Sequence, residues 1–155
     1  MNADKRPSHP GATEFAIVTS RFNALVTERL ATAARETLIA QGVNTGAIHD
    51  YFVAGAWELP PAVAVALDSG RFRAVIACGA VIRGETPHFE HISRAVTDGL
   101  ARLQLEHRTP IGFAVLTTDT LEQALERTGG KAGNKGEEAA IAALEAADVL
   151  DSIKR

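Results

Sequence analysis

The sequence VIACGAVIRGETPH, at residues 75–88, joins an apolar run to a proline and a histidine through two glycines. Val75, Ile76 and Ala77 form a short apolar run of the kind that fills a fully buried strand. Gly79 and Gly84 free the backbone that follows, which predicts a turn where this strand ends. The stretch therefore predicts a strand that leads through a turn into a helix, which is the repeating unit of an α/β sheet.

The helix after this turn begins with residues suited to a helix N-terminus. Thr86 is a good N-cap, and Pro87 fits the first helical position. The unpaired amides of that first turn, together with the helix dipole, would face a phosphate placed there. The dipole disfavours a charged imidazole at His88, which leaves a neutral ring able to accept a proton. The alternative is that His88 is a loop histidine beside a capped helix and has no catalytic role.

Strand-like and helix-like segments alternate along the rest of the chain. Apolar runs predict strands at residues 15–18, 47–53, 73–78 and 111–116. Helical periodicity and start signals predict helices at residues 25–42, 58–67, 87–106, 120–127 and 135–147. Repeated β-α units with buried strands indicate an α/β fold, in which a four-stranded parallel sheet carries helices on both faces through right-handed crossovers.

Length, composition and charge limit the class of protein. The chain has 155 residues, 46% of them hydrophobic, a net charge of −3 and one cysteine, Cys78. We expect no nucleic-acid partner, no membrane partner, no disulfide and a buried structural thiol. No apolar stretch is long enough for a membrane span or a signal peptide, which predicts a cytoplasmic location. We expect residues 1–13 to form a flexible N-terminal arm and residues 14–155 to form a single domain.

Unusual residues follow each predicted strand, where open parallel sheets bind their ligands. These exits hold residues 21–23, 55–58, 79–88 and 117–119. Phe22 and Trp57 stand out, because only 5% of the chain is aromatic and Trp57 is its one tryptophan. The two rings could enclose a flat apolar substrate. Alternatively they fill the open end of the sheet as core, and Glu58 is only a first-turn helix residue.

The segment at residues 127–136 gathers three cations and four glycines in a chain that is acidic overall. We interpret it as a flexible basic hinge. It lacks the spacing of a Walker A motif, which argues against a nucleoside triphosphate site. Arg127 suits a phosphate and Lys135 supplies a point charge. The alternative is a solvated loop in which Arg127 complements the dipole at the end of its helix.

Other catalytic constellations are missing from the sequence. His88 and His91 have no credible third ligand, so we expect no metal. The chain has no Gly-x-Ser-x-Gly motif, and Cys78 precedes the glycine at the strand exit, so no covalent nucleophile is apparent.

Taken together, these motifs resemble the lumazine synthase family of riboflavin biosynthesis. The resemblance extends over residues 15–147 and rests on Arg-Phe-Asn at 21–23, Gly-Ala-Trp-Glu-Leu-Pro at 55–60, the segment 79–88, Thr-Thr at 117–118 and Lys-Ala-Gly-Asn-Lys-Gly at 131–136. It implies a flavodoxin-like three-layer α/β/α fold assembled in pentamers. It also implies condensation of 5-amino-6-(D-ribitylamino)uracil with 3,4-dihydroxy-2-butanone 4-phosphate, without a metal or redox cofactor.

The resemblance also assigns roles to individual residues. His88 becomes the proton-transfer residue, and Glu85, Thr86 and Arg127 become the phosphate site, with Glu85 acting through its amide rather than its carboxylate. The pyrimidine and its ribityl chain are assigned to Phe22, Ala56, Trp57, Glu58, Ala80, Val81, Ile82, Phe113 and Lys135. Since Phe113 lies inside a strand, it is expected to reach the site, with Arg127 and Lys135, only from a neighbouring chain.

Assembly is the last property that the resemblance implies. The turn at residues 129–136 is as short as in shell-forming members, which predicts twelve pentamers in a 60-subunit shell and riboflavin synthase as a possible partner. The arm, which in relatives adds to an adjacent subunit's sheet, is interrupted by prolines here. Two other functions stay open: a non-catalytic flavin or lumazine carrier, and a shell protein whose site has decayed.

Overall fold

A four-stranded parallel sheet forms the centre of the computed structural model, which describes residues 12–155. Its strands are β1 (Glu14–Ser20), β2 (Ile48–Val53), β3 (Phe72–Ile82) and β4 (Ile111–Thr118). They lie in the order β2-β1-β3-β4, and each neighbouring pair is parallel. The chain therefore moves outward from β1 to β2 and then back across β1 to β3. This reversal places a topological switch point between β1 and β3.

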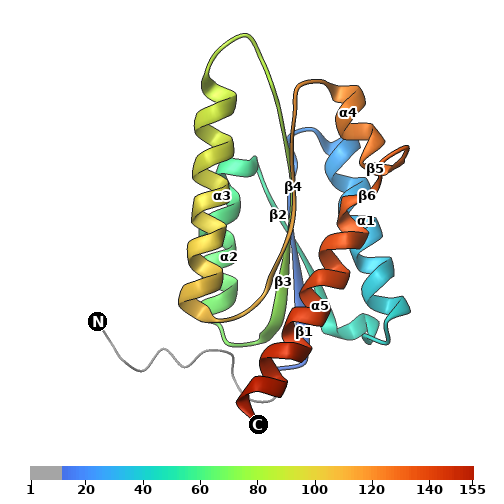
Figure 1. Cartoon of the computed structure of the whole chain (residues 1–155), viewed down its shortest axis with the longest axis vertical. Helices are drawn as coiled ribbons and strands as arrows, with labels where there is room; N and C mark the ends of the chain where they lie inside the picture. The colour runs from blue at the N-terminus through green and yellow to red at the C-terminus, as the bar shows by residue number, and fades with distance from the viewer. Residues whose placement is uncertain (1–11) are drawn as a thin grey trace.

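Helices cover both faces of the sheet (Figure 1). One layer holds α1 (Ala24–Ala40) and α5 (Lys135–Lys154), and the other holds α2 (Leu59–Asp68) and α3 (His88–His107). The short α4 (Leu121–Glu126) lies on the side of α1 and α5. Two single turns, η1 (Thr45–Ala47) and η2 (Ala56–Glu58), precede β2 and α2. The three-layer α/β/α arrangement predicted from the sequence is confirmed.

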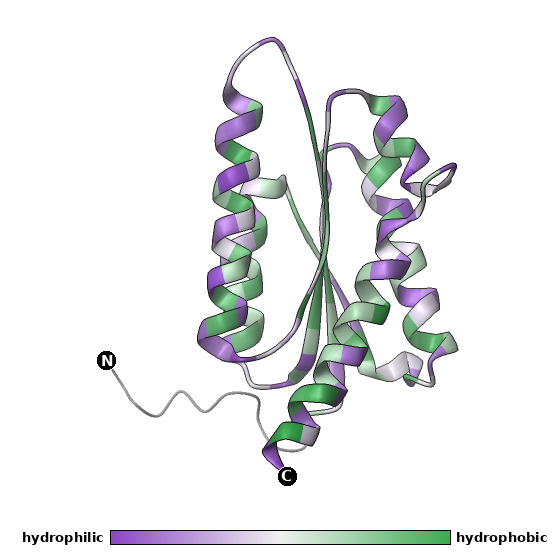
Figure 2. Ribbon diagram, in the orientation of Figure 1, coloured by the Kyte–Doolittle hydropathy of each residue, from purple (hydrophilic) through white to green (hydrophobic). Residues whose placement is uncertain are grey.

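The core consists of two apolar layers separated by the sheet. Side chains alternate along β3, so that Ile76 and Cys78 pack toward α1 and α5 while Val75 and Ala77 pack toward α2 and α3. In Figure 2 hydrophobic colouring predominates in the central strands, and the helices on both sides alternate hydrophobic and hydrophilic bands. Cys78 is fully buried, as predicted for a structural thiol.

The predicted turn at Gly79 is wrong, because β3 continues to Ile82. Gly79 pairs with Val115 inside the β3-β4 ladder. A Cβ atom at this position would lie 2.9 Å from Cδ1 of the buried Leu59, so close packing accounts for the glycine here. The predicted start of the next helix is also one residue early. Pro87 occupies the N-cap position without a side-chain cap, α3 begins at His88, and Thr86 caps nothing.

The segment predicted as a flexible basic hinge forms a hairpin instead. Strands β5 (Thr128–Gly130) and β6 (Gly133–Asn134) pair antiparallel. Gly129 and Gly133 have φ values of 106° and 77°, which only glycine adopts at low cost, and they allow this tight reversal. Asn134 then caps α5 by accepting a hydrogen bond from the Gly136 amide at 2.8 Å. The last helix extends to Lys154, seven residues beyond the predicted end.

Most of the predicted N-terminal arm, residues 1–11, lies outside the described residues. Within residues 12–155, no helix is both long enough and apolar enough to cross a membrane.

Candidate active site

The loop after β1 is fixed across the switch point. The backbone amides of Arg21 and Phe22 donate to the carbonyls of Val53 and Ala54, at 2.8 and 2.9 Å. Asn23 has a left-handed backbone (φ 64°), and its Nδ2 donates to the carbonyl of Ala80 at 3.3 Å. The loop therefore joins the ends of β2, β1 and β3. The Phe22 side chain stays 72% exposed, so within one chain it does not fill the sheet end as core.

Trp57 is held on the single turn η2 after β2. The Gly55 amide donates to Oε2 of Glu58 at 3.0 Å, which closes this turn. Trp57 remains 58% exposed, and like Phe22 it is therefore not a core residue of the isolated chain. The Glu58 carboxylate is used inside the turn, which agrees with its interpretation as a residue of the helix start.

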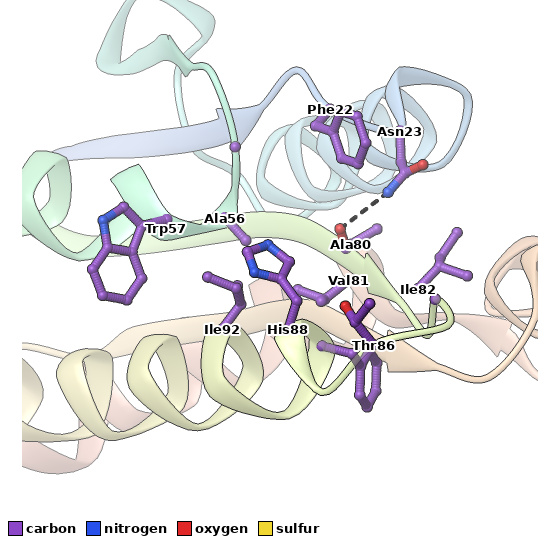
Figure 3. Close-up of a pocket in the computed structure, with 13 residues that line it drawn as sticks. Phe22, Asn23, Ala56, Trp57, Ala80, Val81, Ile82, Thr86, His88 and Ile92 are labelled. Carbon is purple, nitrogen blue, oxygen red and sulfur yellow. Dashed lines mark hydrogen bonds between the residues drawn. The ribbon is translucent and has the colours of Figure 1, made fainter.

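His88 is the first residue of α3 and is exposed. Figure 3 shows its imidazole rising from the helix start toward Ala56, into the space flanked by Phe22 and Trp57. Within the described residues, the ring takes part in no hydrogen bond. Both ring nitrogens are thus available to a bound molecule.

These elements enclose one cavity of about 250 Å³ at the switch point. The end of β3, the loop after β1 and η2 each contribute lining residues. The start of α3 forms the remaining wall, at the bottom of the view in Figure 3. The lining residues are Phe22, Asn23, Gly55, Ala56, Trp57, Ala80, Val81, Ile82, Gly84, Thr86, His88, Phe89 and Ile92. The site combines apolar walls with one imidazole and a short segment of exposed backbone. Such a site can hold a flat ring and exchange a proton with it.

Three predicted site residues lie away from this cavity: Phe113, Arg127 and Lys135. We call them the distant group, and we call Phe22, Trp57 and His88 the pocket group. Arg127 ends α4, and its Nη1 donates to the carbonyl of Gln123 at 2.8 Å. Lys135 begins α5 and pairs with Glu138 at 2.9 Å. Both helices lie across the sheet from α3 (Figure 1).

Phe113 lies on the edge strand β4 and is 47% exposed. It lines a shallow groove between β4 and α3, together with Thr97, Ala101 and Gln104. Glu58 and Glu85 do not line the cavity either, although each is adjacent in sequence to a lining residue. One chain thus assembles the pocket group and leaves the distant group apart.

Sequence reasoning missed several lining residues. Ile92 follows His88 by four residues, so helical spacing places both on one face of α3 and could have identified it. Asn23 and Gly55 belong to motifs that we quoted, but their roles depend on hydrogen bonds to Ala80 and Glu58 that the sequence does not reveal. Phe89 had no sequence signal.

The described part of the chain holds no group of three His, Cys, Asp or Glu side chains that could bind a metal ion.

Comparisons with known proteins agree on one family. The family model described as 6,7-dimethyl-8-ribityllumazine synthase matches residues 12–151. A protein of that name from Anaeromyxobacter dehalogenans is 49% identical over 140 residues, which cover 90% of this chain and 86% of the relative. Another, from Campylobacter jejuni, is 46% identical over 133 residues, or 86% of each chain.

Proposed function

The chain belongs to the 6,7-dimethyl-8-ribityllumazine synthase family of riboflavin biosynthesis, and on that premise we propose that it condenses 5-amino-6-(D-ribitylamino)uracil with 3,4-dihydroxy-2-butanone 4-phosphate. The products are 6,7-dimethyl-8-ribityllumazine, inorganic phosphate and two molecules of water. The observation that carries this proposal is the convergence of Phe22, Trp57 and His88 on one cavity at the switch point.

In this proposal, the pyrimidine lies between the aromatic side chains of the cavity. Phe22 and Trp57 are exposed enough to stack on a ring, because neither is packed in the core. Residues 56–58 and 80–82 hold the ring edge and the ribityl chain. Both segments contribute to the cavity lining, Ala56 and Trp57 from η2 and residues 80–82 from the end of β3.

The phosphate of the second substrate binds at the turn before α3. The amides of Glu85 and Thr86 hold it beside the helix N-terminus, where the dipole favours an anion. Glu85 contributes only its backbone, because its carboxylate would repel the phosphate. His88 follows Thr86 by two residues and lines the same cavity. It therefore lies between the proposed pyrimidine and phosphate positions.

His88 transfers the protons that each step requires. An amine of the pyrimidine attacks the ketone carbon, and the adduct loses water to form an imine. Elimination then breaks the carbon-oxygen bond to phosphate, and closure of the second ring expels the other water. No step changes the overall oxidation state, so the reaction needs no redox cofactor. One base and two well-placed substrates can therefore supply the catalysis.

The distant group completes the site from a neighbouring chain. The cavity of about 250 Å³ is below the usual range for ligand sites, roughly 300–1,000 Å³, so further walls are needed to enclose two substrates. Arg127 then adds a guanidinium to the phosphate, Phe113 closes the pyrimidine pocket, and Lys135 adds a positive charge. A head-to-tail ring supplies one such half to every site.

We further propose that this ring is a homopentamer and that twelve pentamers form a 60-subunit shell, with riboflavin synthase as a possible partner. The connection between α4 and α5, at residues 127–134, is short, and the resemblance to shell-forming members of the family in this turn supports the proposed assembly. A reducing cytoplasm suits the single buried thiol.

Mixing the two substrates with purified protein and following lumazine fluorescence tests the proposed reaction. We expect steady product formation with release of one phosphate per lumazine. Binding of lumazine or flavin without turnover would instead show a carrier. A shell-sized particle that neither turns over nor binds would show a structural protein with a decayed site.

A further inference from the structure

The segment at residues 84–86 carries much of the proposed site but has no hydrogen bonds of its own. Gly84, Glu85 and Thr86 are all exposed, and in the described part of the chain none of them takes part in a hydrogen bond. A Cβ atom on Gly84 would have no neighbour within 4 Å among residues 12–155. Gly84 and Thr86 nevertheless line the cavity. The position of this segment must therefore be set by what holds its two ends.

Arg83 immediately precedes this segment and is tied to the sheet. Its amide donates to the carbonyl of Thr118 at 2.8 Å, which extends the β3-β4 pairing by one residue. Its Nε donates to Oδ1 of Asp119 at 2.7 Å, just after β4. Both bonds fix the first end of the segment to β4.

The same guanidinium also holds the second end of the segment. Nη1 donates to Oε1 of Glu90 at 3.3 Å, and Cζ lies 4.5 Å from the centre of the Phe89 ring. Phe89 and Glu90 flank His88 on its C-terminal side, and Phe89 lines the cavity. The hydrogen bond to Asp119, with a smaller contribution from Glu90, raises the pKa of Arg83. One planar cation thus spans the segment from residue 83 to residue 90.

We propose that Arg83 is a positioning residue for the phosphate-bearing substrate: it fixes the amides of residues 85–86 and the first turn of α3 in the geometry that the reaction needs. This inference deepens the proposed function and rests on it. Exposed ion pairs contribute little to folding, so the network has little value as a source of stability. Its geometry matters because a displacement of about 1 Å at a reacting group can lower a rate a hundredfold.

The alternative is that Arg83 binds the phosphate directly. Removing the Asp119 carboxylate distinguishes this direct role from a positioning role. If Asp119 helps Arg83 to hold the segment, its removal weakens phosphate binding. If Asp119 merely competes with phosphate for the guanidinium, its removal strengthens binding. The two hypotheses therefore predict opposite effects of Asp119→Asn.

The experiment compares wild-type protein with Arg83→Met, Asp119→Asn and the double variant in the assembled state. KM and kcat are measured for each substrate, together with inhibition by inorganic phosphate. We expect Arg83→Met to raise the KM of the phosphate-bearing substrate by about tenfold or more and to weaken phosphate inhibition in parallel. Asp119→Asn should also raise the KM of the phosphate-bearing substrate. The double variant should have the same KM as Arg83→Met, because the carboxylate acts through the guanidinium.

Arg35→Met is the matched control, since Arg35 also pairs with a carboxylate, Asp50 at 2.6 Å, on the β2 side of the sheet. It should leave both KM values unchanged. All variants should melt within about 2 °C of the wild type, as expected for exposed ion pairs. The KM of the pyrimidine should change less than twofold in the Arg83 variant, whereas general loosening of the fold would raise both KM values.

Three results would overturn the inference: unchanged kinetics in Arg83→Met, equal losses for both substrates, or tighter phosphate inhibition in Asp119→Asn. A wild-type protein that forms no lumazine would instead overturn the proposed function. Phosphate binding, measured by calorimetry on the same variants, would then still decide whether Arg83 shapes this segment.

Discussion

The pocket group and the distant group differ in what their side chains already contact. Phe22, Trp57 and His88 face one cavity, and the His88 ring has no hydrogen-bond partner within the described residues. In the distant group, Arg127 is bonded to a carbonyl of its own helix and Lys135 to a carboxylate one turn away. The pocket group is thus open to ligands, while Arg127 and Lys135 of the distant group are held in place by their own chain.

The backbones that carry the two groups differ in the same way. The pocket group lies on loops and a helix start at the carboxyl edge of the sheet. In the distant group, Lys135 is anchored where α5 packs closely on α1: a Cβ atom on the adjacent Gly136 would lie 2.1 Å from the carbonyl oxygen of Leu30. A heterologous ring joins two different surfaces of neighbouring chains, so the distant group of one chain can close the pocket of the next. The following predictions test whether the pocket group of one chain and the distant group of its neighbour form one site.

His88→Ala should have the largest effect, because it removes the proton carrier of the pocket group. We expect kcat to fall by about ten- to a thousandfold while the remaining contacts still position the substrates. The exposed ring has no hydrogen-bond partner among residues 12–155, so the melting temperature should not change. Stopped-flow or steady-state lumazine formation between pH 6 and 8 measures the effect. A variant with full rate over this range would reduce His88 to a neighbour of the helix start.

Gly136→Ala should break the anchor of the distant group. The added methyl group meets backbone atoms of α1, which cannot move aside as a side chain can. We expect the free energy of unfolding to fall by about 3 kcal/mol or more. Gly84→Ala is the matched control, because nothing lies within 4 Å of its Cβ position. Denaturant titration at one protein concentration compares them, and equal stabilities would mean that α5 is not closely packed on α1.

Arg127→Ala should act on one substrate only. An arginine-phosphate pair binds the ground state and the transition state alike, so the KM of the phosphate-bearing substrate should rise by about ten- to a hundredfold with little change in kcat. The KM of the pyrimidine should stay the same. Arg127→Lys retains the charge and should raise this KM by a smaller factor. A loss confined to the pyrimidine would show that we have exchanged the two halves of the site.

The smallest effect concerns Cys78, in the strand beneath the pocket group. Burial raises the pKa of this thiol from its ordinary value of 9.0 to about 12. Below about pH 8 the thiol is neutral in both the folded and the unfolded chain, so its stabilising contribution is complete. Above pH 9 it ionises first in the unfolded chain, and this contribution is progressively lost as the pH rises toward 12.

The comparison with Cys78→Ala isolates this contribution. We expect the wild type to have the larger free energy of unfolding at neutral pH, because the variant leaves a cavity. The difference in free energy of unfolding between the two proteins should become smaller as the pH rises from about 8 to about 10.5. Denaturant titrations at matched protein concentrations give the two curves. A difference that stays constant would show that Cys78 ionises equally readily in the folded state.

The sequence predicted the pocket group better than the distant group, for physical reasons. Strand exits can be located from short apolar runs, and the carboxyl ends of parallel strands share one edge, so residues 22, 57 and 88 converge as expected. In the distant group, Arg127 and Lys135 flank a segment whose conformation depends on tertiary contacts. Four glycines at residues 129–136 suggested flexibility, but two form a tight hairpin and Gly136 is a packing residue.

Two sequence predictions around β3 were wrong, one because of a long-range contact and one because of a neighbouring residue. Gly79 suggested a turn, yet its role is to make room for Leu59, which is distant in sequence. Thr86 suggested a cap, yet Pro87 takes that position and leaves residues 84–86 open. The Arg83 network depends on Asp119, which is 36 residues away in the sequence, and no local sequence pattern predicts this contact. The residues of a site were therefore easier to predict than the contacts that position them.

Complementation between variants tests most directly whether each site is shared by two chains. His88→Ala spoils the pocket group, Arg127→Ala spoils the distant group, and each homomer should be a poor enzyme. Random coassembly of equal amounts places two intact halves together at roughly a quarter of the interfaces.

Lumazine formation is measured for variants that are coexpressed and for separately assembled particles that are only mixed. We predict that coexpression restores activity toward that fraction and that mixing restores none. Mass spectrometry confirms that both variants occupy the same particles. No gain in particles shown to be mixed would mean that each site lies within one chain, which would contradict the account.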